Sequence, residues 1–179
     1  MNRAQRRQSA KPASRFDKNA GLMAFHTRLN LHNRTQTTQE DLEILMIEYY
    51  MRLEELTKGR LSGDGFIQLV EANFFGFCLA ARLHKFSANE ETAQAFEPSQ
   101  KDFEDAAEGL QRVGERYQKL AKFGADAEGI KAMRESLKWV KELIQVSTRD
   151  HVQHALMQAE VMTKDKLRSL YASSGRRIA

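Results

Sequence analysis

The stretch GFIQLVEANFFGFCLAARLHKF, residues 65–86, decides the fold because it is apolar on more than one side of a helix. Two stripes follow helical spacing, with Ile67, Val70, Phe74, Phe77 and Ala81 on one side and Leu69, Phe75, Leu79, Leu83 and Phe86 on another. A helix that is apolar on several sides has to be covered on several sides. We therefore predict that this segment is the most buried helix, and that Gly76 marks the close approach of a neighbouring helix.

The segment GRLSGDGFIQLVE, residues 59–71, leads into this helix and has the spacing of an EF-hand calcium loop at five of six key positions. Counted from Arg60, the third, fifth, sixth, eighth and twelfth positions are Ser62, Asp64, Gly65, Ile67 and Glu71. The first position normally supplies an anionic oxygen, and here it holds the guanidinium of Arg60, which accepts no hydrogen bond. We therefore predict a turn between two helices, with Ser62 or Asp64 as the helix cap, and no calcium site.

The segment before residue 59 predicts the first long helix. The sequence offers two capping boxes for its start, Thr37 with Glu40 and Thr38 with Asp41. A stripe at helical spacing follows, made of Leu42, Leu45, Met46, Tyr49, Leu53 and Leu56. Lys58 and Gly59 predict its end, as a cation near the last carbonyls and a left-handed cap.

Two further helical segments are predicted after residue 98. Ser99 and Asp102 open one of them, and Gly124 ends it. Asp126 opens the next, whose pattern either breaks or exposes a polar turn at residues 147–150 and then continues to about residue 172. Residues 87–98 are predicted to be a polar linker in which Phe96 serves as an apolar anchor. Residues 16–34 fit a short helix and an extended segment equally well.

Helix formers dominate the composition, β-branched residues are sparse, and the chain has only 2 prolines in 179 residues. This composition favours helix nearly throughout. We predict an all-α bundle of four to five long helices with a flexible basic N-terminal arm. Residues 1–15 form the disordered arm, residues 16–172 a single helical domain, and residues 173–179 a frayed basic tail.

The formal net charge of +4 is distributed unevenly along the chain. Residues 1–18 have a net charge of +5 and residues 164–179 of +4, so the remaining 145 residues have a net charge of −5. Basic ends of this kind either contact nucleic-acid phosphates or acidic partner surfaces, or serve as solubilising tails. The candidate contact residues are Arg3, Arg6, Arg7, Lys11, Arg15, Lys18, Arg176 and Arg177.

The sequence has no motif that indicates catalysis. The glycine-rich phosphate loops, the GxSxG elbow, the His-Glu-x-x-His zinc motif and paired Cys-x-x-Cys are all absent. His151 and His154 are spaced to share a helix face beside Asp150, but they are more simply surface or interface histidines than metal ligands. We therefore predict no enzyme activity, no catalytic residue, no cofactor and no metal.

The cellular setting follows from the single cysteine and from the distribution of apolar residues. Cys78 lies in an apolar run and has no cysteine to pair with in the chain, which favours a reducing compartment such as the cytoplasm. No stretch reaches about 18 uncharged apolar residues, so we expect no membrane partner. The opening residues carry basic groups without the apolar segment of a secretory signal.

The first two long helices have more apolar residues than one inner stripe uses, and this surplus predicts a protein partner or self-association. The predicted interface residues are Tyr49, Tyr50, Met51, Phe74 and Phe75. We expect a non-enzymatic helical interaction protein of the adaptor or inhibitor type, binding another protein or a nucleoprotein complex. The opening MNRAQRRQ and the small size are compatible with a phage or plasmid accessory protein. The alternative is a nonspecific nucleic-acid-binding module that uses the basic termini.

Residues 59–71 give the first testable prediction. Because Arg60 occupies the position of the first calcium ligand, millimolar calcium is expected to leave the thermal melting temperature unchanged, as measured by circular dichroism with magnesium as the control. A melting temperature that rises with calcium and not with magnesium would show that the turn binds the ion.

Overall fold

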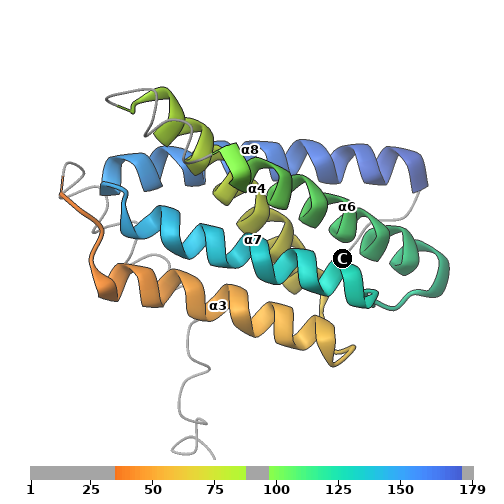
Figure 1. Ribbon diagram of the computed structural model, residues 1–179. Helices are drawn as coiled ribbons and strands as arrows, with labels where there is room; N and C mark the ends of the chain where they lie inside the picture. Colours follow the sequence, from red (N-terminus) through yellow and green to blue (C-terminus); the bar gives the residue numbers. More distant parts are fainter. Residues whose placement is uncertain (1–34, 88–96, 175–179) are drawn as a thin grey trace, which may run out of the picture.

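The computed structural model describes residues 35–87 and 97–174, and these form five helices (Figure 1). They are α3 (Gln39–Thr57), α4 (Gly63–Lys85), α6 (Glu97–Leu120), α7 (Ala127–Gln145) and α8 (Arg149–Ser174). The described ranges contain no strand beyond one isolated bridge, between Gln36 and Thr148. The predicted all-α bundle is confirmed. The basic arm, the segment at 16–34, the Phe96 anchor and the end of the basic tail lie outside the described residues.

Helix α4 is the centre of the bundle and packs against each of the other four helices (Figure 1). Phe66, Phe75 and Leu79 are at most 1% exposed. At Gly76, an added Cβ would lie 2.7 Å from Cγ2 of Val140 on α7, and closer still to the ring of Phe103 on α6. The predictions of a buried helix and of a close approach at Gly76 are therefore both confirmed.

The composition of α4 also bears on the prediction of no membrane partner. Of the helices in the described ranges, α4 is long and apolar enough to cross a membrane by length and composition. The core helix of a soluble bundle passes the same test. The most apolar part of α4 is mostly buried inside this bundle, so its position in the core explains its apolar composition.

The caps of the first two helices follow the sequence. Thr38 and Asp41 form the capping box of α3, with Thr38 Oγ1 accepting from the Asp41 amide at 3.2 Å. Gly59 follows α3 with a φ of 64°, as predicted. Ser62 caps α4 by accepting from the Gly65 amide at 3.1 Å. Gly65 itself is not in the left-handed region, and its lack of a side chain is explained by the Leu61 and Arg52 side chains that pack over it.

The predicted end of α6 at Gly124 is wrong, because the helix ends at Leu120 and Ala121 takes the left-handed conformation, with a φ of 53°. The cause is Phe123, whose ring stacks on Tyr117 with centroids 4.1 Å apart. The chain has to turn back directly after the helix to bury this ring. The predicted start of α7 is confirmed, since Asp126 accepts from the Gly129 amide at 2.6 Å.

The helical pattern is broken at residues 147–150, where α7 ends and α8 begins. The break is held by the segment before α3, with the Thr37 amide donating to the Ser147 carbonyl at 3.1 Å. Next to it, the guanidinium of Arg149 donates through Nε and Nη2 to Oδ2 of Asp41, at 2.9 and 2.7 Å. Asp41 is fully buried, so this ion pair ties the starts of α3 and α8 together inside the protein.

Gly76 is expected to be the least replaceable glycine of the core. Gly76→Ala inserts a methyl group against Phe103 and Val140, and we expect it to lower the free energy of unfolding by about 1–3 kcal/mol, measured by urea denaturation. Gly114→Ala is the control. Its added Cβ would lie 3.4 Å from Cζ of Phe66, an ordinary contact, and the helix gains about 0.5–1 kcal/mol in propensity. Equal effects of the two substitutions would contradict close packing at Gly76.

The buried ion pair predicts a pH dependence. Burial raises the pKa of Asp41, but hydrogen bonds from Thr38 and Arg149 outweigh it and hold the pKa below the ordinary 3.8. A lowered pKa contributes stability that is present above the unfolded-state value and is lost as the pH falls through the folded-state value. Asp41→Asn should therefore cost about 3 kcal/mol near neutral pH and progressively less below about pH 4, measured by urea denaturation.

The control for this pH dependence is Asp165→Asn, which removes an exposed ion pair with Arg168 on α8. Exposed ion pairs contribute about 0–1 kcal/mol, so Asp165→Asn should change the free energy of unfolding little, both near neutral pH and below about pH 4. A cost of Asp41→Asn that stays constant down to acid pH would contradict the ionised pair.

Candidate protein-binding groove

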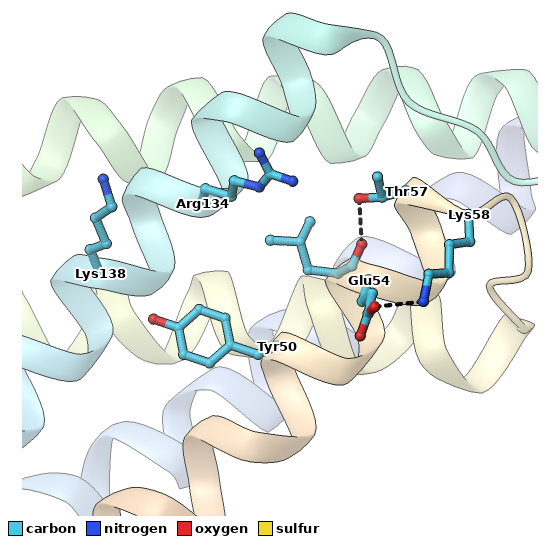
Figure 2. Close-up of a pocket in the computed structure, with 7 residues that line it drawn as sticks. Tyr50, Glu54, Thr57, Lys58, Arg134 and Lys138 are labelled. Atoms are coloured by element: carbon cyan, nitrogen blue, oxygen red, sulfur yellow. Dashed lines mark hydrogen bonds and ion pairs between the residues drawn. The ribbon is translucent and has the colours of Figure 1, made fainter.

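Helices α3 and α7 lie side by side and antiparallel, because the start of α3 is tied to the end of α7 through Thr37 and Ser147 (Figure 1). A pocket with a volume of ≈ 440 Å³ opens between them. Its lining comprises Tyr50, Leu53, Glu54, Thr57 and Lys58 from α3 and Arg134 and Lys138 from α7 (Figure 2). We call this pocket and its rims the α3/α7 groove.

Helix α3 supplies the apolar side of the groove. Leu53, at 4% exposed, belongs to the core and forms the floor. Ile47, Tyr50 and Met51 are 63%, 40% and 51% exposed, and their spacing of three and four residues places them on one outward face. We call these three residues the α3 stripe. Large apolar side chains grouped on an exposed helix face are typical of a docking surface.

Helix α7 supplies the charged side. Lys131, Arg134, Lys138 and Lys141 are exposed and follow spacings of three, four and three residues, so they share one helix face, which we call the α7 cationic row. Lys138 forms an ion pair with Glu135 at 2.7 Å. The other three have no ion-pair partner within the ranges that the structure describes. The row therefore offers three cations without an ion pair in the described ranges, on a helix that also carries Glu128, Glu135 and Glu142.

The polar groups on the α3 side of the groove are engaged by neighbours along the same segment. Lys58 Nζ donates to Glu54 Oε1 at 2.6 Å, and this hydrogen bond lowers the pKa of Glu54 (Figure 2). The Thr57 hydroxyl donates to the Leu53 carbonyl at 2.9 Å. Burial raises the pKa of the Tyr50 phenol although the positive charge of Lys138 opposes the shift, so the ring stays neutral at ordinary pH.

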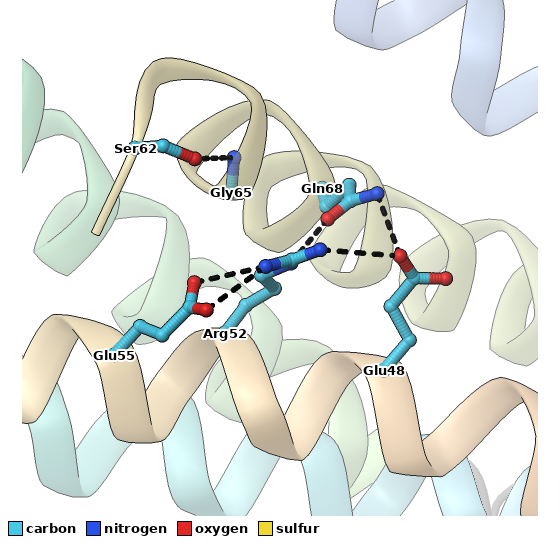
Figure 3. Close-up of polar contacts among 6 residues, drawn as sticks. All are labelled: Glu48, Arg52, Glu55, Ser62, Gly65 and Gln68. Carbon is cyan, nitrogen blue, oxygen red and sulfur yellow. Dashed lines mark hydrogen bonds and ion pairs between the residues drawn. The ribbon is translucent and has the colours of Figure 1, made fainter. Parts of the chain in front are cut away.

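A polar network on the other side of α3 fixes the orientation of the helix (Figure 3). The guanidinium of Arg52, 7% exposed, donates to the Glu55 carboxylate at 3.0 and 2.9 Å and to Gln68 Oε1 of α4 at 2.5 Å. Gln68 in turn donates to Glu48 Oε1 at 2.8 Å. Because this network joins α3 to α4, it holds the α3 stripe on the outward face.

The structure separates the five predicted interface residues. Tyr50 and Met51 are exposed beside the groove, as an interface requires. Tyr49 and Phe75 are 5% and 0% exposed, so assigning them to an interface was wrong, because they fill the core between the helices. Phe74 is half-buried against the core and lines a gap of ≈ 20 Å³ between α4 and α6.

Ile47 and the α7 cationic row were not among the residues predicted from the sequence. Ile47 lies off the buried stripe of its helix, so its position in the helical pattern would have identified it. The four cations share a face of α7 that the sequence pattern also defines, but their place beside the α3 stripe depends on the helix packing. The predicted contact residues of the basic ends, at 3–18 and 176–177, lie outside the described residues.

His151 and His154 are occupied by contacts at the start of α8. His154 Nδ1 lies 2.9 Å from the Asp150 carbonyl oxygen, and the Asp150 carboxylate accepts from Arg82 at 3.0 Å. The His151 ring stacks on Phe86 with centroids 5.8 Å apart, and burial together with Arg82 lowers its pKa. Within the described ranges, no group of three or more His, Cys, Asp or Glu side chains is arranged to hold a metal ion.

The segment with calcium-loop spacing is mostly helix. Because α4 starts at Gly63, Asp64 and Glu71 are seven helical residues and about 10 Å apart along the axis. Burial and the carboxylates of Glu160 and Glu48 raise the pKa of Glu71, which disfavours its ionised form. The predicted capped turn between two helices is what the structure shows.

The groove combines an exposed apolar stripe on α3 with a row of exposed cations on α7. Comparison of the chain with protein-family models, with curated proteins and with solved structures gave no match.

Proposed function

We propose that the protein is a non-enzymatic helical interaction protein of the adaptor or inhibitor type, which binds another protein or a nucleoprotein complex through the α3/α7 groove. The observation that carries this proposal is the α3 stripe. Its three large apolar side chains are 40% to 63% exposed on a helix at the edge of the bundle. Burying them against a partner removes apolar surface from water, which favours association.

The polar lining of the groove supports binding more than catalysis. Its carboxylate, Glu54, is exposed and paired with Lys58, and its hydroxyl, on Thr57, is bonded to the backbone. A nucleophile needs a base within hydrogen-bonding reach, and the lining residues supply no such pair. Burial raises the pKa of the Cys78 thiol to about 11, so this group is a poor nucleophile as well.

The charge distribution favours a second candidate, a nonspecific nucleic-acid-binding module. The two ends of the chain have net charges of +5 and +4, and the middle has a net charge of −5. Basic ends of this kind bind nucleic-acid phosphates and release the counterions around them. In this alternative the ends bind and the groove has no role. For both candidates we propose a cytoplasmic protein, since its one cysteine is buried and cannot form a disulfide within the chain.

In-cell photocrosslinking tests the proposed function. We expect a photoreactive phenylalanine analogue at Tyr50 to give a discrete crosslinked protein adduct in cells of the source organism, because the partner covers this side chain. The adduct should fade when Lys138→Glu is added, since the reversed charge lies beside Tyr50. The measurement is the adduct mass on a denaturing gel, followed by peptide identification.

The matched control for this experiment is the same analogue at Met157, which is 59% exposed on α8. Helix α8 packs mainly on α4, away from the groove. No adduct at Tyr50, or the same adducts at both positions, would contradict binding through the groove.

A further inference from the structure

Resting on the proposed function, we infer that the partner presents an acidic amphipathic helix to the α3/α7 groove. A large apolar side chain of this helix packs on Tyr50 and enters the pocket above Leu53. Its carboxylates face the α7 cationic row. Two features of the groove point to such a helix, namely its charge and the absence of backbone partners along its walls.

Charge complementarity sets the sign of the partner. Three of the four cations in the α7 cationic row have no ion-pair partner in the described part of the chain. The carboxylate on the opposite rim, Glu54, is paired with Lys58 and does not compensate them. Arg134 has no ion-pair partner in the described ranges, and a carboxylate that approaches the edge of its guanidinium can accept two parallel N–H hydrogen bonds. A basic segment would meet repulsion from Arg134 and Lys138 at the same place.

The backbone of the groove walls favours a helical occupant. Every extended segment carries a row of N–H and C=O groups that need partners when they are covered. The walls are helices α3 and α7, whose own backbone groups are bonded internally, so they have none to offer. A helix satisfies its own backbone and packs its apolar stripe between two helices, in the helix-in-groove mode. The 19 residues of α3 give it about 28 Å to lie along.

A second copy of this chain and a nucleic acid fit the groove less well. A symmetric dimer through this face would bring two cationic rows together, and Glu54 of α3 is already paired with Lys58 within each copy. A nucleic acid would complement the cations, but its phosphates gain nothing from Ile47 and Met51. An acidic helix with apolar anchors uses both halves of the groove.

A display selection tests this chemistry without knowing the partner. The probe is a yeast-displayed library of helices of about 18 residues, with apolar anchors at helical spacing and Glu, Gln or Lys at every other position. The full-length chain is the bait. We expect Glu to be enriched over Lys at the positions flanking the anchors, and Arg134→Glu combined with Lys138→Glu to weaken the selected helices about tenfold or more.

The double variant should also invert the preference and select Lys-rich helices. Both substitutions are at exposed positions, so the thermal melting of the variant should match the original chain. Arg168→Glu, a charge reversal at an exposed site on α8, is the control and should leave the selected helices bound. Tyr50→Ala should weaken binding without changing the preference for Glu.

Several results would overturn the inference. These are enrichment of neutral or basic helices, selected helices that bind the double variant as well as the original chain, and no enrichment above background. A dimer in light scattering that Tyr50→Ala dissociates would assign the groove to a second copy. Binding of a single-stranded oligonucleotide that the double variant abolishes would assign it to nucleic acid. A crosslink from Tyr50 to a different protein, together with a selection that yields neutral, basic or no helices, would leave the proposed function standing and reject only the acidic helix.

Discussion

Helix α4 is buried on nearly every side, and this burial determines how the other helices are arranged. A helix whose apolar residues extend around its circumference is stable in water only inside a shell of other helices. Here α3, α6, α7 and α8 form that shell, and Gly76 lets the Phe103 and Val140 side chains reach the α4 backbone. The order of the helices around α4 then decides which faces remain on the surface.

The candidate binding surface is a consequence of this packing. Helix α3 contacts α4 and α7 and has no other extensive helix contact in the described part of the chain, so its outer face remains exposed. The buried Asp41–Arg149 pair and the Arg52 network fix α3 at both ends of its length, which keeps the α3 stripe beside the α7 cationic row. Breaking either interaction leaves a charged group poorly compensated, so α3 has little freedom to rotate.

Much of the fold was predictable because local rules determine it. A capping box at Thr37 or Thr38, the left-handed Gly59, a cap at Ser62 or Asp64 and the central position of α4 all follow from residue types within a few positions of one another. The structure selects Thr38 and Ser62. The end of α6 was mispredicted because the stacking of Phe123 on Tyr117, a tertiary contact, determines it and overrides the usual preference for glycine. A local pattern cannot show that contact.

The exposed apolar stripe of α3 was predictable only in part. Tyr50 and Met51 are exposed, whereas Tyr49 and Phe75 are equally apolar and buried. Distinguishing them requires the angular position of each residue relative to the core, which Ile47 also illustrates. The Asp41–Arg149 pair joins residues 108 positions apart, and the juxtaposition of the α3 stripe with the α7 cationic row is equally non-local.

Oxidative footprinting of two methionines in living cells measures directly whether a partner covers the α3/α7 groove. Met51 beside the groove and Met157 on α8 are 51% and 59% exposed, so their oxidation in the purified protein should be similar. If a partner occupies the α3/α7 groove, the sulfoxide yield at Met51 falls in cells relative to the purified protein, while the yield at Met157 is unchanged. Equal yields at both methionines in cells would contradict the groove as the site of interaction.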